Sequence, residues 1–285
     1  MENLKNVGNK KVLNTNKLYF FTFVIIYLTD SLLFATNSNT LFLYCNRFGL
    51  IVISLLMLAN SIRKSEKIPI WLFGLSTSIL ISALLAGRIS NGYSYYTMIA
   101  ALWFGYLFAS KYSLEQFSHC FCRIMRIIAI VSLVGWLFSE TIRSMGDIPT
   151  ITNTVGAQYK TLFLTNIPML ANRARRNMGP FWEAGAYQVY LSLALFMTMF
   201  IEKHKMKWVD AVLFIIAALT TLSGAALMPL LLIIAAYMFD KRNLKSFALV
   251  MLLFGLVTVL FSTGTFDEIT AKMGNYVETL SLIHI

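Results

Sequence analysis

The chain has 285 residues, of which 58% are hydrophobic and only 13% are charged. Soluble domains contain about 45–50% apolar and about 25% charged residues, so this composition excludes a soluble globular enzyme. A disordered chain and a disulfide scaffold are excluded as well, because the hydrophobic content is high and there are only three cysteines. We therefore expect an integral membrane protein, in which the net charge of +11 reflects Lys and Arg in cytoplasmic loops.

Apolar segments recur between charged residues along the whole chain. The hydrocarbon core of a bilayer is about 30 Å thick and is crossed by about 20 helical residues. The segments predict an all-α fold, a polytopic membrane helical bundle with nine transmembrane helices in a single membrane domain over residues 1–285. The predicted spans are 18–36, 43–62, 68–87, 93–110, 124–139, 181–201, 208–223, 225–239 and 246–262.

The distribution of Lys and Arg predicts a cytoplasmic N-terminus, because sixteen of the 24 cations then lie inside and eight outside. Two outer segments are long: the loop of about 140–180 between spans five and six, and the C-terminal tail 263–285. The loop holds five of the eight outer cations. They indicate either a solvated basic surface or a site for an anionic ligand.

The first span contains an acidic residue, Asp30, toward its outer end. Intramembrane acids often mark proton or substrate paths, but Asp30 is also close enough to the end to reach interfacial water. Arg88, on an adjacent outer loop, is a candidate partner. A His-Cys-x-Cys cluster in a predicted cytoplasmic loop has too few ligands for a structural zinc site, so we expect no metal: His119, Cys120 and Cys122.

The outer loop ends in RRNMGPFWEAGAYQ, residues 175–188. Gly179 allows an unusual backbone angle or a close approach of another group, and Pro180 suits the first position of a helix. We therefore expect the sixth span to begin near Pro180. Free N–H groups at its start would suit a phosphate or diphosphate, as would the arginines that precede it: Arg173, Arg175 and Arg176.

Glu183 falls in the first turn of this predicted span, with Tyr187 one turn further on the same face. A carboxylate just inside a span is costly unless it pairs or faces a watery cavity, which makes Glu183 a functional candidate. The alternative is structural. Acidic residues are favoured at helix N-termini, so Glu183 would cap the helix and pair with Arg176.

The stretch RNMGPFWEAGAYQ resembles the bacterial family of O-antigen polymerases, O-antigen ligases and related capsule or exopolysaccharide polymerases. Members share Arg-x-x-Gly-x-Phe followed by Glu-Pro or Pro-Asn; Ala184 stands where proline is common. TTLSGAAL, 220–227, is similar to the family's Thr-x-Ser turn between two later spans, with Gly224 where many relatives have arginine. FDEITAKM, 266–273, is a weaker match to the start of a second outer loop.

The resemblance implies a metal-independent glycosyltransferase without a cofactor at the outer face of the bacterial inner membrane. It would transfer a growing glycan from undecaprenyl diphosphate onto another lipid-linked repeat unit. Arg176, helped by Arg173 or Arg175, would stabilise the leaving diphosphate, and Glu183 would accept the proton of the acceptor hydroxyl. The candidates for a substrate path are Asp30, Arg88 and Tyr187.

Implied partners are the lipid-linked oligosaccharide, membrane lipid, a chain-length regulator and a flippase, but no nucleic acid. Three alternatives remain open: an O-antigen ligase, a flippase or transporter of the same glycan, and a structural membrane subunit. Relatives continue past the position of Lys272 through a further outer loop and more spans. The resemblance therefore also implies that this chain is truncated at its C-terminus.

Overall fold

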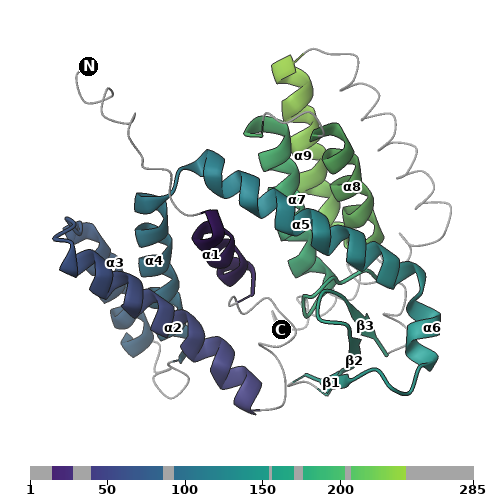
Figure 1. Cartoon of the computed structure of the whole chain (residues 1–285), viewed down its shortest axis with the longest axis horizontal. Coiled ribbons are helices and arrows are strands. Elements are labelled where there is room, and N and C mark those ends of the chain that lie inside the picture. Colours follow the sequence, from purple (N-terminus) through teal and green to yellow (C-terminus); the bar gives the residue numbers. More distant parts are fainter. Residues whose placement is uncertain are drawn as a thin grey trace, which may run out of the picture. The chain divides into compact units, whose positions relative to one another are not determined.

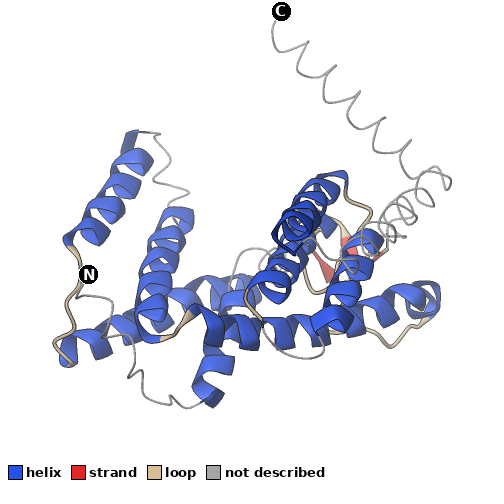
Figure 2. Ribbon diagram, turned by 90° about the horizontal axis from the view of Figure 1, so that it is seen from above, coloured by secondary structure: helices blue, strands red, loops and turns tan. Residues whose placement is uncertain are grey.

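The computed structural model describes residues 15–27, 40–85, 93–153, 156–169, 176–202 and 207–241. The chain is mostly helical (74%), as predicted, and within the described ranges the strands form one small sheet (Figure 2). It divides into two compact units, Met1–Phe121 and Cys122–Ile285. The boundary between the two units falls inside a helix.

Among its described residues, the first unit contains the helices α1 (Thr15–Tyr27), α2 (Thr40–Arg63), α3 (Ile70–Leu85) and α4 (Tyr93–Lys111) and the beginning of α5 (Leu114–Leu137) (Figure 1). Both α2 and α3 pack against α4. Ser54 Oγ on α2 donates to the carbonyl oxygen of Ala100 at 2.9 Å, and Trp103 Nε1 on α4 donates to Ser76 Oγ at 2.9 Å. These hydrogen bonds connect α2 and α3 to α4.

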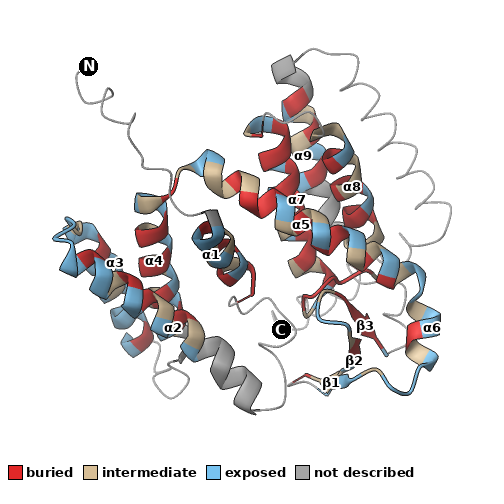
Figure 3. Cartoon of the chain, viewed as in Figure 1, coloured by how far each residue is buried: buried red, intermediate tan, exposed pale blue. Residues whose placement is uncertain are grey.

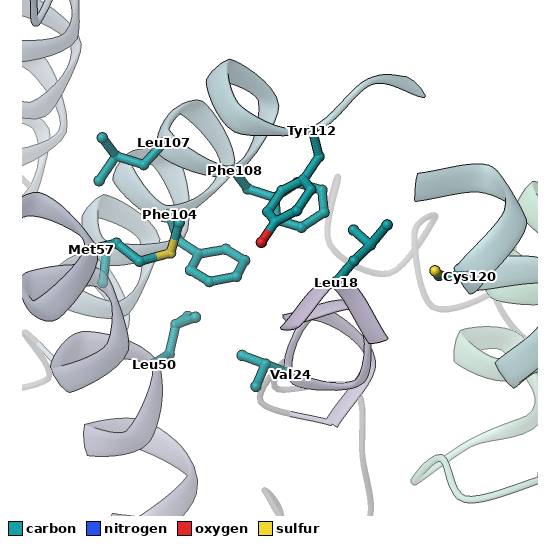
Figure 4. Close-up of a cluster of buried hydrophobic side chains, with 10 residues drawn as sticks. Leu18, Val24, Leu50, Met57, Phe104, Leu107, Phe108, Tyr112 and Cys120 are labelled. Atoms are coloured by element: carbon teal, nitrogen blue, oxygen red, sulfur yellow. The ribbon is translucent and has the colours of Figure 1, made fainter. Parts of the chain in front are cut away.

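The core of the first unit is rich in aromatic side chains. Phe104, Phe108 and Tyr112 are spaced four residues apart, so they lie on one face of the chain at α4. Their ring centroids are 6.0 Å and 4.8 Å apart in succession. Aliphatic side chains from α1 and α2 pack against this row (Figure 4): Leu18, Val24, Leu50 and Met57. The cluster therefore joins three helices through apolar contacts.

Helix α5 begins at Leu114, well before the predicted span 124–139. The backbone N–H of Gln116 donates to Ser113 Oγ at 3.2 Å, and the N–H of Ser113 donates to Gln116 Oε1 at 3.1 Å. This reciprocal capping box starts the helix among polar residues that hydropathy assigns to a loop. The loop prediction was therefore wrong, and its cluster lies on the helix: His119, Cys120 and Cys122.

The second unit contains the rest of α5, the later helices and the sheet. Its helices are α6 (Ser139–Ser144), α7 (Ala184–Phe200), α8 (Lys207–Thr220) and α9 (Gly224–Lys241). Helix α7 packs against both α8 and α9, and much of it is buried (Figure 3). Arg126 on α5 forms an ion pair with Asp210 on α8, whose side chain is only 2% exposed. This pair links α5 to α8.

The predicted outer loop of residues 140–180 contains a three-stranded antiparallel sheet that was not predicted. Its strands are β1 (Thr150–Thr152), β2 (Gln158–Thr161) and β3 (Asn166–Pro168), in the order β1-β2-β3. Ile151 pairs with Tyr159, and Lys160 pairs with Ile167. All of β3 is buried. Gly135 on α5 leaves room for Thr165, the residue before β3, because a Cβ there would lie 2.6 Å from Thr165 Cγ2.

Eight of the nine predicted spans overlap a described helix, and the ninth, 246–262, lies outside the described residues. Among the helices that could be assessed, α5 is the only one both long and apolar enough to cross a membrane. Apolar segments of α1, α2, α3 and α7 are shorter, with 10–17 residues. The helical class is therefore confirmed, whereas the arrangement of nine spans is not.

Candidate functional site

The RNMGPFWE segment, residues 176–183, forms a loop that leads into α7. Its centre is a tight turn, in which the N–H of Phe181 donates to the carbonyl oxygen of Met178 at 3.1 Å. Gly179 in this turn has a φ of +53°, a left-handed conformation that favours glycine. The unusual backbone angle predicted at Gly179 is thereby confirmed.

Helix α7 begins at Ala184 and not near Pro180 as predicted. Pro180 belongs to the turn, and Glu183 still has extended backbone angles (φ −148°, ψ 158°) immediately before the helix. The start at Pro180 was wrong because a left-handed Gly179 directs the chain into a turn, and the helix follows only after that turn closes. The free N–H groups of α7 therefore lie after Glu183.

Tyr187 supports this turn from inside the protein. A Cβ on Gly179 would lie 3.0 Å from Tyr187 Cζ, so the turn rests on the face of the ring. Phe181 stacks on the same ring with centroids 5.4 Å apart, and the Tyr187 hydroxyl lies 2.7 Å from Ser132 Oγ on α5. Tyr187 was predicted to line a substrate path, but its side chain is 0% exposed in this structure. Its observed contacts are those of a packing residue.

Asn177 connects the loop to two other segments, although the sequence did not single it out. Its backbone N–H donates to the carbonyl oxygen of Thr220 at 2.9 Å, and Nδ2 donates to Thr220 Oγ1 at 3.0 Å and Ser132 Oγ at 3.3 Å. Its Oδ1 accepts from the N–H of Gly179 at 3.1 Å. Asn177 is 2% exposed, so these bonds replace water and hold the loop in place.

The sheet holds the same loop through Asn166 on β3. Its N–H donates to the carbonyl oxygen of Gly179 at 2.7 Å, and its Nδ2 donates to the carbonyl oxygen of Phe181 at 3.3 Å. Asn166 is 2% exposed. The sequence offered no signal for Asn166, because neither its strand nor its burial was predicted.

The TTLS segment forms the turn between α8 and α9, as predicted from its resemblance. The N–H of Leu222 donates to the carbonyl oxygen of Leu219 at 3.2 Å, and Leu222 has a φ of +48°. Thr221 Oγ1 donates to Gln188 Oε1 on α7 at 3.2 Å. Together with the bonds from Asn177, this contact brings the two segments that resemble the polymerase family next to each other.

Glu183 lies where these two segments meet, and its side chain is exposed. Glu183 is the N-cap residue of α7, as the structural alternative expects, but its carboxylate makes no hydrogen bond to the N-terminal N–H groups of the helix. Arg176 is partly buried at the beginning of the same loop. Arg176 and Glu183, the two predicted catalytic residues, therefore lie on one short loop, and the side chain of Glu183 is exposed.

The other predicted site residues lie outside the described residues: Asp30, Arg88, Arg173 and Arg175. Within the described part of the chain, no group of three or more His, Cys, Asp or Glu side chains could hold a metal ion. In comparisons with protein-family models, curated proteins and solved structures, no match to this chain was found.

Replacing Asn177 by alanine is expected to lower the free energy of unfolding by about 2 kcal/mol, because it leaves the buried Gly179 N–H without its acceptor. Thr220→Val is the matched control. It removes only the bond to Asn177 Nδ2 and the local bond to Ala217, and it should cost about 1 kcal/mol. Thermal unfolding of the purified protein measures both values. An Asn177→Ala variant as stable as the wild type would contradict the role of Asn177 as a connecting residue.

Proposed function

We propose that this chain is an integral membrane glycosyltransferase that polymerises undecaprenyl diphosphate-linked oligosaccharide repeat units. It acts at the outer face of the bacterial inner membrane, with the N-terminus in the cytoplasm. The proposal depends on one observation above all. The loop 176–183 and the turn 220–223, which separately resemble segments of the polymerase family, are hydrogen-bonded to each other around an exposed Glu183.

The surface of α3 supports a membrane location. Of its sixteen residues, only Leu72 and Ala83 are buried, and Figure 3 shows the helix largely in the colour of exposed residues. Eight of the exposed side chains are large and apolar, including Ile70 at 87% and Leu85 at 85%. A contiguous apolar surface of this kind is costly in water and is covered at low cost by lipid chains.

Three of the four hydroxyl groups of α3 donate within the helix, as a hydrocarbon environment favours. Ser76, Thr77 and Ser78 each donate to the carbonyl oxygen four residues earlier, at 2.8, 2.9 and 3.0 Å. Two of the three residues are exposed, so in water these hydroxyls would have solvent partners. Their inward hydrogen bonds are compatible with a surface in contact with lipid.

In the proposed reaction, Arg176, helped by Arg173 or Arg175, stabilises the negative charge that develops on the leaving undecaprenyl diphosphate. A guanidinium group suits this task, since its planar donors bind phosphate oxygens in two places. Glu183 accepts the proton of the acceptor hydroxyl as that oxygen bonds to the donor sugar. These residues perform the transfer without a metal ion.

The test is reconstitution of the purified protein in liposomes with lipid-linked repeat units extracted from the bacterium that makes it. We expect a ladder of glycans, and we expect Arg176→Ala to slow chain extension about 100-fold, as for the loss of one charge-stabilising donor. Glu183→Gln is expected to slow it at least as much. Matched controls are Glu140→Gln and Arg143→Ala, which form an ion pair in the same predicted outer segment.

Chain extension by Arg176→Ala at the wild-type rate would overturn the assignment. Other products would identify the alternatives directly. Glycan joined once to lipid A core indicates a ligase, and movement of labelled lipid-linked sugar across the bilayer without chain growth indicates a transporter.

A further inference from the structure

Two polar side chains from separate segments converge on one point above Gly185, in the first turn of α7. A Cβ built on Gly185 would lie 3.5 Å from Glu183 Oε1 and 3.8 Å from Ser223 Oγ. The third nearest atom, Glu183 Cδ at 3.9 Å, belongs to the same carboxyl group. A small group at this point would therefore contact both the carboxylate and the hydroxyl.

The glycine is not required by the backbone. Gly185 is helical, and an added Cβ would lie at ordinary van der Waals distances from the three nearest described atoms, so alanine would fit. Glycine inside a helix costs about 1 kcal/mol relative to alanine. Among the described residues, helix stability and packing thus give no reason for glycine here, whereas a ligand group placed between Glu183 and Ser223 does.

The hydroxyl group of Ser223 differs from the other two in the turn 220–223, because those two make hydrogen bonds to backbone carbonyl oxygens. Thr220 and Thr221 donate their hydroxyls to the carbonyl oxygens of Ala217 and Ala218 at 2.7 Å. Ser223 Oγ makes no hydrogen bond with any described residue, and the Glu183 carboxylate makes none to the start of α7. Both groups are at least partly exposed, so both are available to a ligand.

The turn that carries Ser223 is nevertheless held in place. Thr220 accepts two hydrogen bonds from Asn177, and Thr221 donates to Gln188. Asn177 is in turn bonded to Gly179 in the loop that leads to Glu183. The distance between the hydroxyl and the carboxylate is therefore set by hydrogen bonds made by neighbouring residues, as positioning of a reactant requires.

We propose that Ser223 is a positioning residue that holds the acceptor sugar hydroxyl over Gly185, next to Glu183. This inference rests on the proposed polymerase function and adds the place where the acceptor binds. The acceptor oxygen forms a bond to the anomeric carbon of the donor glycan, and its proton moves to the Glu183 carboxylate. The bond between that carbon and the phosphate oxygen breaks, and its electron pair leaves with undecaprenyl diphosphate.

The experiment uses the full chain in detergent, with an undecaprenyl-linked donor and a labelled acceptor repeat unit on a short alkyl diphosphate. Ser223→Ala is expected to raise the KM for the acceptor about tenfold and to leave the KM for the donor unchanged. Ser223→Thr, which keeps a hydroxyl, should recover most of the loss. Ser144→Ala, which removes an exposed hydroxyl that donates within α6, should leave the KM for the acceptor within about twofold.

Gly185→Ala provides a second test, whose expected result would not follow if Gly185 and Ser223 had only a structural role. The added methyl group fills the point between Glu183 and Ser223, so we expect a loss of activity of at least tenfold without any decrease in thermal stability. Acceptor KM values at the wild-type level in both Ser223→Ala and Gly185→Ala would overturn the inference. If the wild-type protein extends glycans and only Arg176→Ala and Glu183→Gln fail, the polymerase proposal stands and the role of Ser223 does not.

Discussion

Replacing Arg126 by alanine is expected to lower the free energy of unfolding by about 3 kcal/mol, at the lower end of the range for breaking a buried ion pair. The guanidinium group donates to Asp210 Oδ2 and joins α5 to α8. The Asp210 side chain is 2% exposed, whereas that of Arg126 is 32% exposed. Removal of Arg126 leaves the Asp210 carboxylate buried without this cation. Removal of Asp210 instead leaves a partly exposed guanidinium group, which water can solvate. Asp210→Asn should therefore cost less, as measured by thermal unfolding.

Glu140→Gln serves as the control for Arg126→Ala. Glu140 pairs with Arg143 and is 82% exposed, so its loss should change the free energy of unfolding by no more than about 0.5 kcal/mol. The double variant Arg126→Met with Asp210→Leu removes both charges and should recover most of the lost stability. Equal losses in the two single variants, or a double variant as unstable as Arg126→Ala, would show that burial of Asp210 is not the cause.

Replacing Gly179 by alanine is expected to cost about 3 kcal/mol of unfolding free energy. A left-handed backbone costs a residue with a Cβ about 1–2 kcal/mol, and overpacking adds about 1–3 kcal/mol. The new Cβ would lie 3.0–3.1 Å from three atoms of the Tyr187 ring. That ring cannot easily retreat, because Phe181 stacks on it and its hydroxyl is bonded to Ser132. The measurement is again thermal unfolding of the purified protein.

Gly156→Ala separates the cost of a left-handed backbone from the cost of overpacking. Gly156 also has a positive φ, of +81°, but an added Cβ would meet no atom within 4 Å. It should therefore show only the conformational cost, about 1 kcal/mol. Gly105→Ala, in the helix α4 and also without a neighbour within 4 Å, should be neutral or stabilising. If Gly179→Ala costs no more than Gly156→Ala, the contact with Tyr187 does not limit the turn.

The positions of the helices could largely be predicted from hydropathy, because a helix that packs or meets lipid must be apolar over its length. The predicted helix ends were less accurate where polar side chains or turns determine the residue at which a helix begins. Helix α5 starts at a capping box between Ser113 and Gln116, and α7 starts after the turn at Gly179. The sheet was missed because its strands have only three or four residues, too few for an alternating pattern to be recognised.

The candidate site was predicted in part. Gly179 could be recognised because its conformational need is local, and Glu183 because a carboxylate beside an apolar segment is unusual. Asn177 and Asn166 could not, because their hydrogen bonds join segments far apart in the sequence. Arg126 was counted only as a cytoplasmic charge, yet it has a specific partner, Asp210, 84 residues later.

The sequence by itself determined the helical class, the apolar segments, the unusual backbone angle at Gly179 and the choice of Arg176 and Glu183 as candidates. The first three follow from composition or from a local backbone requirement, and the two candidates follow from charge beside an apolar segment and from the family resemblance. Only the tertiary structure decided that Tyr187 is buried behind the turn, that Asn177 joins the loop to Thr220, and that Ser223 faces Glu183 across Gly185. The reason is that hydrogen bonds and ring contacts between distant segments depend on how the helices pack, and no local pattern specifies that packing.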